Sequence, residues 1–264
     1  MSHFTVAVFS DGTKTVDELL SLYNENIEVA PYISETKEQM IERAKERKAD
    51  YIERKNKDEE TSDWMQQYID ASTDEELYQC EFDDDYQYDA DGNQLSTYNP
   101  DSKWDWYSIG GRWNGMLKAK TGLHGGGGLF SPNRREQGKY DSAKVSDIDF
   151  SPDEEIYKKS IRFWEVVVDK QELLPGEDKN NFFNYYKESY YTSRYGDKET
   201  YARLQASFST FAVITPDGKW YEKGKMGWWA AVSNEEMAWD EKYKERFIDT
   251  ANLDWTLTIV DCHI

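Results

Sequence analysis

The two ends of the chain show the clearest alternation of hydrophobic and polar positions. Residues 3–9 alternate branched or aromatic residues with small ones, and residues 255–264 alternate polar with apolar residues. Alternation with a period of two is typical of a strand that has one buried face. We therefore predict that one strand begins the chain and that another ends it.

Between these strands, apolar positions three or four residues apart predict helices. Two helix starts carry a capping box, in which Thr precedes Gln or Glu by three residues: Thr36 with Gln39, and Thr73 with Glu76. Short apolar runs predict a strand over residues 161–169 and a hairpin that joins residues 208–215 to 219–222. The predicted helices cover residues 16–23, 37–57, 62–70, 73–80, 179–206 (interrupted at Gly196) and 235–250.

This order of elements predicts an α+β fold with a mainly antiparallel sheet that contains both terminal strands, with helices packed on one face. We expect a single domain over residues 1–264. Within it, residues 58–102 are expected to form an acidic helical insertion. Residues 121–142, which include four consecutive glycines at 125–128, are expected to form a flexible loop.

The charge of the chain is concentrated in that insertion. The chain has 52 Asp+Glu and 32 Lys+Arg, for a formal net charge of -20, and residues 58–102 hold fifteen acids and no Lys or Arg. Such a balance argues against binding to nucleic acid or anionic lipid by bulk attraction. An aromatic content of 15% argues against a disordered acidic tail. No stretch approaches the roughly 20 apolar residues of a membrane helix, and two cysteines are too few for a disulfide framework.

Three segments carry a resemblance to a known group of proteins. They are the opening Met-Ser-His-Phe-Thr-Val, the central Lys-Trp-Asp-Trp-Tyr-Ser-Ile-Gly-Gly-Arg-Trp and the closing Val-Asp-Cys-His-Ile. Over nearly its whole length the chain resembles uncharacterised proteins encoded by tailed bacteriophages and prophages. The resemblance implies a phage gene product made in the host bacterial cytoplasm. That group has no established activity, so the resemblance transfers no catalytic residue.

The first candidate site combines the two ends of the chain. His3 begins the first predicted strand, and Asp261 and His263 lie near the end of the last one. If these strands pair antiparallel, the two histidines fall at the same edge of the sheet. Two imidazoles near a carboxylate can act as an acid/base pair in phosphoester chemistry or bind a divalent metal. Apart from this divalent metal, we predict no cofactor.

A short motif at the first strand bears on this site. His3-Phe4-Thr5-Val6 resembles one half of a two-histidine phosphoesterase motif, but the second half is incomplete because only Ile264 follows His263. The alternative interpretation is that these polar residues simply finish two strands at an exposed edge.

The second candidate site is the aromatic-rich centre of the chain. An Arg can hold a carboxylate or phosphate through two parallel hydrogen bonds, glycines let the backbone approach a ligand, and aromatic rings stack on a base or a sugar. The alternative is a buried Asp105–Arg112 pair that fixes an aromatic core. The predicted ligand-binding residues are Trp104, Asp105, Trp106, Tyr107, Gly110, Gly111, Arg112 and Trp113.

The third candidate is the acidic segment itself. A row of carboxylates can imitate the phosphates of DNA or RNA and occupy a basic groove on another protein, in a salt-sensitive encounter. The alternative is a solvated surface that aids solubility. The predicted partner-binding residues are Asp74, Glu75, Glu76, Asp83, Asp84, Asp85, Asp89 and Asp91.

Three hypotheses of function follow. The leading one is a phage accessory protein, for host takeover or anti-defence, that binds a host protein through a nucleic-acid-mimicking acidic surface. The second is a small hydrolase that acts on a phosphate- or nucleotide-containing substrate, with His3, Asp261 and His263 as catalytic residues and Arg112 holding the anion. The third is an aromatic-lined module that binds a nucleotide or a sugar without chemistry. The sequence leaves open whether the protein is an enzyme.

Overall fold

The structure is a computed structural model that describes residues 2–57, 59–120, 139–227 and 231–264. It divides into two compact units: the sheet unit, Met1–Asn24 with Asp101–Ile264, and the acidic unit, Glu25–Pro100. Residues 121–138 of the loop predicted over 121–142 lie outside the described residues. The last residues of that loop run through β7 (Lys139–Tyr140) into β8 (Ser142–Lys144). That the whole chain makes one domain stays a prediction.

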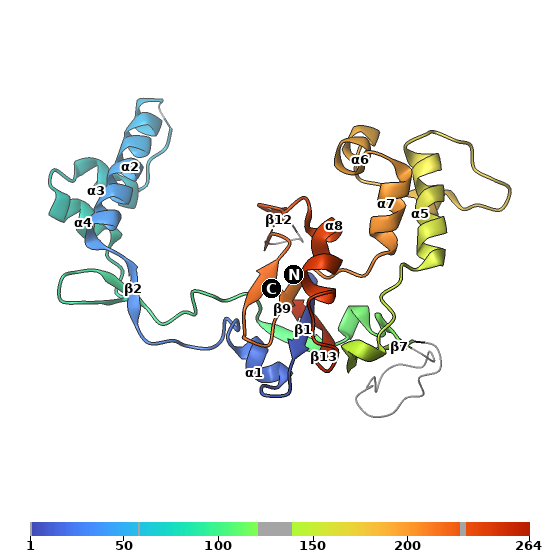
Figure 1. Ribbon diagram of the computed structural model, residues 1–264. Helices are drawn as coiled ribbons and strands as arrows, with labels where there is room; N and C mark the ends of the chain where they lie inside the picture. Colours follow the sequence, from blue (N-terminus) through green and yellow to red (C-terminus); the bar gives the residue numbers. More distant parts are fainter. Residues whose placement is uncertain (1, 58, 121–138, 228–230) are drawn as a thin grey trace. The chain divides into compact units, whose positions relative to one another are not determined.

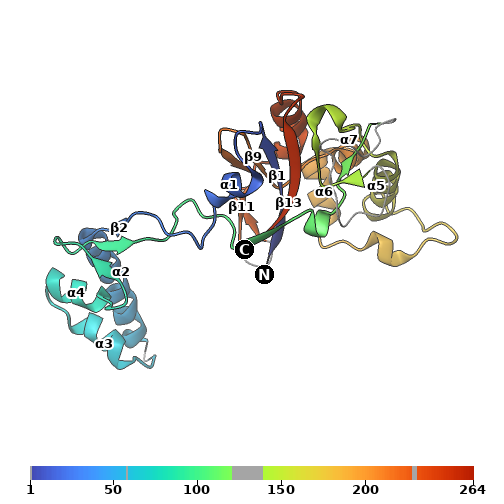
Figure 2. The same cartoon turned by 90° about the horizontal axis from the view of Figure 1, so that it is seen from below.

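The sheet unit is built on the pairing of the two ends of the chain (Figures 1 and 2). β1 (His3–Ser10) and β13 (Thr256–His263) pair antiparallel along their full length, from His3 opposite His263 to Ser10 opposite Thr256. The predicted terminal strands and their pairing are therefore confirmed. The strand order is β10 (Trp220–Glu222), β9 (Ala212–Ile214), β1, β13 and β5 (Trp106–Ile109), and β8 also pairs with β13.

The pairings in this sheet are mainly antiparallel, and β1 with β9 is the parallel pair. The predicted α+β fold with both terminal strands in a mainly antiparallel sheet is thus confirmed. The predicted hairpin over 208–222 is present as β9 and β10.

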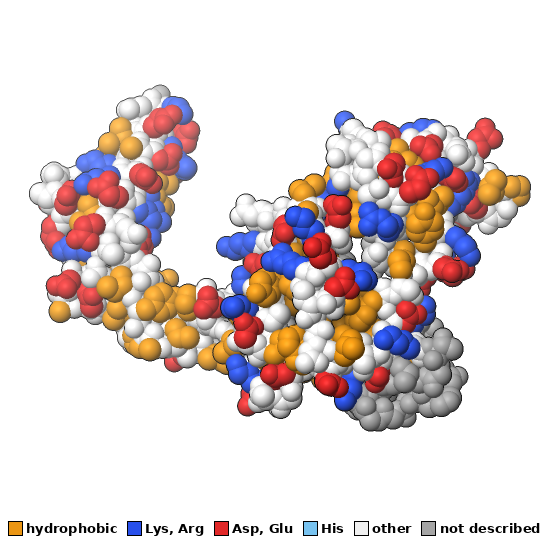
Figure 3. Space-filling view, in the orientation of Figure 1, with side chains coloured by type: hydrophobic (Ala, Val, Ile, Leu, Met, Phe, Trp, Pro, Cys, Tyr) orange, Lys and Arg blue, Asp and Glu red, His pale blue; other side chains and the backbone are white. Residues whose placement is uncertain are grey.

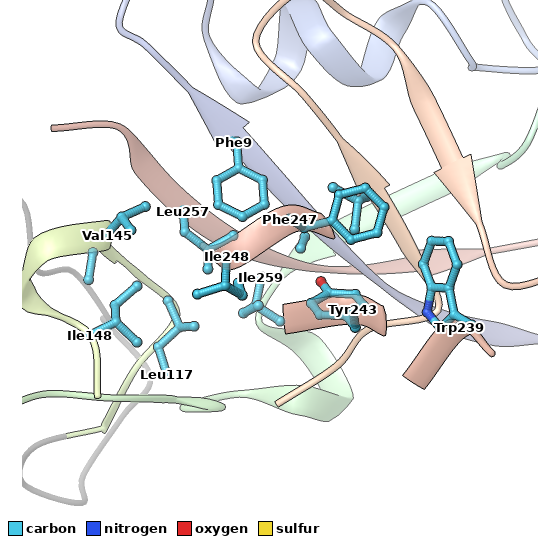
Figure 4. Close-up of a cluster of buried hydrophobic side chains, with 13 residues drawn as sticks. Phe9, Leu117, Val145, Ile148, Trp239, Tyr243, Phe247, Ile248, Leu257 and Ile259 are labelled. Carbon is cyan, nitrogen blue, oxygen red and sulfur yellow. The ribbon is translucent and has the colours of Figure 1, made fainter. Parts of the chain in front are cut away.

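Helices cover both faces of this sheet, whereas the sequence predicts helices on one. The reason is that the inner residues of β1 and β13 are buried whichever way they point, so both faces need cover. On one face α1 (Val16–Ser21) packs Leu19 and Leu20 against β1. On the other, α8 (Trp239–Tyr243) and the π-helix η5 (Lys244–Ile248) pack against both strands, as Figure 4 shows.

One element prediction is wrong in type. Residues 161–169, expected as a strand, belong largely to α5 (Glu154–Val167). The β-branched run Val166–Val168 suits a strand by propensity alone. The helix forms because Asp153 accepts hydrogen bonds from the first-turn backbone and because Ser160, Trp164 and Val167 bury one helical face.

The rest of the sheet unit consists of short elements. The predicted helical stretch over 179–206 is present as α6 (Glu188–Tyr195) and α7 (Lys198–Ala206), separated at Gly196, and a 3-10 helix η3 precedes them. The helix predicted over 235–250 begins later, at Trp239. The further elements are η1 (Gly111–Trp113), β6 (Leu117–Lys118), η2 (Val145–Asp147), η3 (Lys179–Phe182), β11 (Lys225–Met226) and β12 (Val232–Ser233).

The acidic unit packs helices beside a small sheet. Thr36 and Thr73 form the predicted capping boxes at the starts of α2 (Lys37–Asn56) and α4 (Asp74–Glu81). The helices bury a core of Ala44, Tyr51, Tyr68, Ala71 and Leu77. The predicted acidic helices are therefore confirmed, and the basic-rich α2 packs against them. Its elements are β2 (Tyr32–Glu35), α2 (Lys37–Asn56), α3 (Asp63–Asp70), α4 (Asp74–Glu81), β3 (Gln87–Tyr88) and β4 (Gln94–Ser96).

Candidate functional site

The register of the sheet brings polar residues from three strands onto one face. His3 lies opposite His263, which in turn lies opposite Trp106, and Asp261 lies opposite Ser108 on β5. Residues directly opposite in an antiparallel pair point to the same face. The next pair along, Ala7 and Ile259, belongs to the buried core. The polar group therefore extends one face of the hydrophobic core to the end of the sheet.

The first carboxylate–imidazole pair joins the two terminal strands. Nδ1 of His3 lies 2.8 Å from Oδ1 of Asp261. The Asp261 side chain is only 3% exposed, and its Oδ2 accepts a hydrogen bond of 2.9 Å from the backbone N–H of Arg112. A buried carboxylate needs such partners, so Asp261 is fixed and in turn fixes the His3 ring.

The second pair joins the last strand to the segment before β5. Nδ1 of His263 lies 2.7 Å from Oδ1 of Asp105, and the same oxygen accepts the backbone N–H of Trp106 at 2.7 Å. The backbone N–H of Asp105 donates to the carbonyl of His263 at 3.1 Å. Asp105 and His263 are thus bound to each other through both side chain and backbone.

The two imidazoles lie side by side beneath a tryptophan. The ring centroids of His3 and His263 are 5.0 Å apart at an interplanar angle of 77°. Trp106 stacks on His263, with centroids 5.0 Å apart and planes 17° apart, and meets His3 edge to face at 5.3 Å. Trp106 is 45% exposed. The first candidate site and part of the second therefore form one cluster.

One atom of this cluster lacks a partner. Nε2 of His263 is buried, and no described residue forms a hydrogen bond with it. Since Nδ1 faces the Asp105 carboxylate, the neutral ring carries its proton on Nδ1 and leaves a bare lone pair on Nε2. A buried polar atom without a partner is costly, so this position is suited to a group supplied by a ligand.

The Gly110–Gly111 pair lets backbone pass close to two buried carboxylates. Both residues have positive φ, +69° and +48°. A Cβ on Gly111 would lie 2.3 Å from Cβ of Asp261, and one on Gly110 would lie 2.6 Å from Cγ of Asp141. Sequence reasoning missed Asp141, which is buried and accepts the Gly115 N–H. In the sequence, Asp141 lies among polar residues, and no motif there predicts that it is buried. Only the Gly110–Gly111 pair indicates that the backbone passes close to another group.

The other predicted ligand-binding residues are spread over different environments. Trp104 is buried, and its Nε1–H donates to the carbonyl of Leu20 at 3.1 Å. Tyr107 packs with Trp104 in the cluster on the opposite face of the sheet, and Trp113 is half-buried beside the main core. Arg112 is exposed, and its guanidinium makes no ion pair with a described residue. Only Asp105 and Trp106 of this set contact an imidazole.

The acidic unit carries a formal charge of -14, from 22 acidic and 8 basic residues. Some of the 22 acids pair with basic residues of α2, which the net charge already counts. Lys45 pairs with Asp74, and Lys37 pairs with Glu75. Figure 3 accordingly shows both signs of charge interspersed on the visible face of this unit.

The remaining predicted partner-binding acids follow two patterns. Glu76 accepts the backbone N–H groups of Ser72 and Thr73, and Asp89 accepts those of Asp91 and Asn93. No described cation pairs with the other four, which are exposed: Asp83, Asp84, Asp85 and Asp91.

Four further observations concern metal ligands, the cysteines and membrane-spanning helices. No group of three or more His, Cys, Asp or Glu side chains in the described ranges has the arrangement of a metal site. Burial raises the pKa of the Cys262 thiol well above its usual value, which disfavours a thiolate nucleophile next to His263. Both cysteines are free. Among the helices of the described residues, none has the length and hydrophobicity to cross a bilayer.

Comparisons of the chain with protein-family models, with curated proteins and with solved structures find no match. A function for this chain therefore has to be argued from the geometry of the paired carboxylates and imidazoles.

Proposed function

We propose that the chain is a hydrolase that acts on a phosphate- or nucleotide-containing substrate by paired acid–base catalysis at His3 and His263. One observation carries the proposal: two imidazoles 5.0 Å apart, each bound at Nδ1 by its own carboxylate. A carboxylate on Nδ1 fixes the tautomer, orients the ring and stabilises the imidazolium that forms when the ring accepts a proton.

The two rings divide the proton transfers of one displacement. His263, whose Nε2 lone pair has no partner among the described residues, takes a proton from the attacking oxygen. His3 donates a proton to the oxygen that leaves. Each positioned transfer contributes typically about 10²–10⁴-fold in rate. The exposed Arg112, whose backbone N–H binds Asp261, supplies positive charge for the phosphate.

A divalent metal is the alternative use of the same atoms. Histidines that ligate metals commonly donate the other ring nitrogen to a carboxylate, as His3 and His263 are placed to do. No cofactor is proposed beyond this. Metal analysis of the purified protein separates the two uses: a stoichiometric ion that is lost in His3→Ala and His263→Ala variants favours the metal.

The hydrolase proposal is tested with chromogenic esters. Turnover of bis(p-nitrophenyl) phosphate and of p-nitrophenyl nucleotide esters is measured for the wild type, His3→Gln and His263→Gln. Asp217→Asn, in the β9–β10 turn, serves as the matched control because its carboxylate makes only local contacts. We expect each histidine variant to lose at least about 10²-fold, with the control unchanged. Wild-type turnover that survives in both variants contradicts the proposal. Nucleotide binding without turnover favours the third hypothesis, a binding module.

The acidic unit supports a second candidate function, which is binding of a host protein that has a basic nucleic-acid groove. The observation that favours it is the net charge of -14 with an exposed run at Asp83–Asp85 that forms no ion pair with the described Lys and Arg side chains. The resemblance to phage proteins gives this candidate its setting, an accessory protein for host takeover or anti-defence in the bacterial cytoplasm. The carboxylates that α2 neutralises, Asp74 and Glu75, contribute less to such a surface.

Capture from bacterial lysate at low and high salt tests this second candidate. A groove held by charge retains its partner at low salt and releases it at high salt. A variant with Asn at residues 83–85 should lose the partner, while a charge-matched control with Gln at Glu172, Glu199 and Glu241 of the sheet unit keeps it. Retention that ignores both salt and the Asn variant contradicts the candidate.

A further inference from the structure

The contacts of Trp106 do not explain why one face of its indole is exposed. One side of the indole stacks on His263, while 45% of the residue is open to solvent. A similarly exposed tryptophan elsewhere, Trp64 at 50%, meets Tyr51 and Tyr68 edge to face, and both tyrosines belong to the core of the acidic unit. Trp106 instead lies on a polar imidazole.

We propose that Trp106 selects the substrate, by stacking a nucleobase on its exposed face while the attached phosphate meets the two imidazoles. The inference rests on the proposed hydrolase function and narrows its substrate class from any phosphate ester to a nucleotide. Base–aromatic stacking is tolerant of base identity because every base has a π-face. The site is therefore expected to prefer nucleotides over simple phosphate esters without strong preference among bases.

The position of Trp106 suits a substrate whose base stacks on the indole and whose phosphate meets the two imidazoles. It is bonded to Asp105 in the chain, and its backbone N–H donates to the carboxylate that holds His263. The same ring meets His3 edge to face at 5.3 Å. A planar group stacked on the exposed face has the indole between it and His263, so the phosphate attached to it reaches the imidazoles around the edge of the indole. There the partnerless Nε2 of His263 gives this polar part of the ligand an atom to bind.

A nucleotide meets both requirements in one molecule, since it carries a planar ring and a phosphate joined by a sugar. A sugar alone satisfies the stacking face and leaves the acid–base pair without a phosphate, and a simple alkyl phosphate ester does the reverse. Holding the base also positions the phosphate, and binding energy from such a non-reacting part of a substrate aids the chemical step.

The experiment compares two substrates rather than two absolute rates. The kcat/KM for p-nitrophenyl esters of uridine and thymidine phosphates is divided by that for methyl p-nitrophenyl phosphate, a simple diester with the same leaving group and no base. This ratio is measured for the wild type, Trp106→Leu, Trp106→Phe and the matched control Trp64→Leu. Rates on the simple diester report the state of the imidazoles, so a variant that merely disturbs His263 lowers both rates and leaves the ratio unchanged.

We expect the wild type to prefer the nucleotide esters by about tenfold or more, as loss of one base–aromatic stack implies. Trp106→Leu should abolish the preference mainly through KM, Trp106→Phe should keep most of it, and Trp64→Leu should not change it. A preference that survives in Trp106→Leu overturns the inference and leaves the hydrolase proposal standing. No turnover of either substrate by the folded wild type overturns both.

Discussion

Two buried carboxylates, one in each unit, are held in opposite ways. Glu81 in the acidic unit and Asp261 in the sheet unit have side chains only 2% and 3% exposed. Glu81 is bound by the guanidinium groups of Arg43 and Arg47 and by the hydroxyl of Tyr68. Asp261 is bound by one imidazole and one backbone N–H.

The difference lies in whether the partner can change its charge. Arginine stays protonated in proteins, so the Glu81 cluster can only hold α2 to α4. Histidine exchanges its proton near neutral pH, so the Asp261–His3 pair can take part in proton transfer. A buried carboxylate therefore indicates structure or chemistry according to its partner. The second imidazole beside His3 makes chemistry the better interpretation in the sheet unit.

The largest effect on stability is expected when Glu81 loses its two arginine partners. An Arg43→Met, Arg47→Met variant leaves a buried carboxylate without its cations, and breaking a buried pair in this way costs about 3–5 kcal/mol. We expect the acidic unit to unfold earlier in urea, as followed by far-UV circular dichroism. Turnover of the phosphate ester, which belongs to the sheet unit, should not change. A parallel loss of turnover would contradict a purely structural role for the Glu81 cluster.

A smaller loss is expected from crowding Asp261. Gly111→Ala places a methyl group 2.3 Å from Cβ of Asp261 at a residue with φ of +48°. Strain of this kind costs about 1–3 kcal/mol, and the shifted carboxylate releases His3, so stability and turnover should fall together. Gly12→Ala is the matched control, since Gly12 has φ of +88° and nothing within 4 Å. It reports the backbone strain alone and should leave turnover intact. Equal effects of the two variants would show that the contact with Asp261 is unimportant.

The smallest effect is expected at a half-buried Arg–carboxylate pair. Hydrogen bonds from Arg162 and from the backbone N–H of Leu174 lower the pKa of Glu177 from 4.5 to about 2. A lowered carboxyl pKa adds stability above the unfolded value, and that stability is lost as pH falls from about 4.5 towards 2. Arg162→Gln should therefore lower the melting temperature slightly at pH 6 and by clearly less at pH 2.5. A difference of equal size at the two pH values refutes the linkage.

The sequence predicts the parts of the fold that local patterns govern. Alternation over residues 3–9 and 255–264 identifies β1 and β13, and with only three histidines the meeting of His3 and His263 follows from antiparallel pairing. Thr36 and Thr73 place two helix starts through their capping boxes. The run Val166–Val168 misleads, because burial of a helical face outweighs β propensity there.

Long-range pairing is what the sequence does not predict. Asp105 stands out among the central aromatics, but its partner is set by β5 pairing with β13, and no turn or spacing fixes that pairing. Likewise, the sequence of the acidic segment shows a run of charge without counterions. In the structure α2 packs on this segment and supplies Lys37 and Lys45. In both regions the carboxylate's partner comes from a segment that is distant in the sequence. The identity of that partner decides whether the carboxylate belongs to a solvated surface, a structural pair or a candidate site.

A double-variant cycle at the two imidazoles tests the central claim most directly. Turnover of bis(p-nitrophenyl) phosphate is compared for the wild type, His3→Gln, His263→Gln and the variant with both changes. Residues that act as one catalytic unit have strongly non-additive effects. We predict that each single variant loses at least about 10²-fold and that the double variant is no slower than the worse single one. Losses that multiply, or single variants that keep wild-type turnover, would contradict a joint acid–base role for His3 and His263.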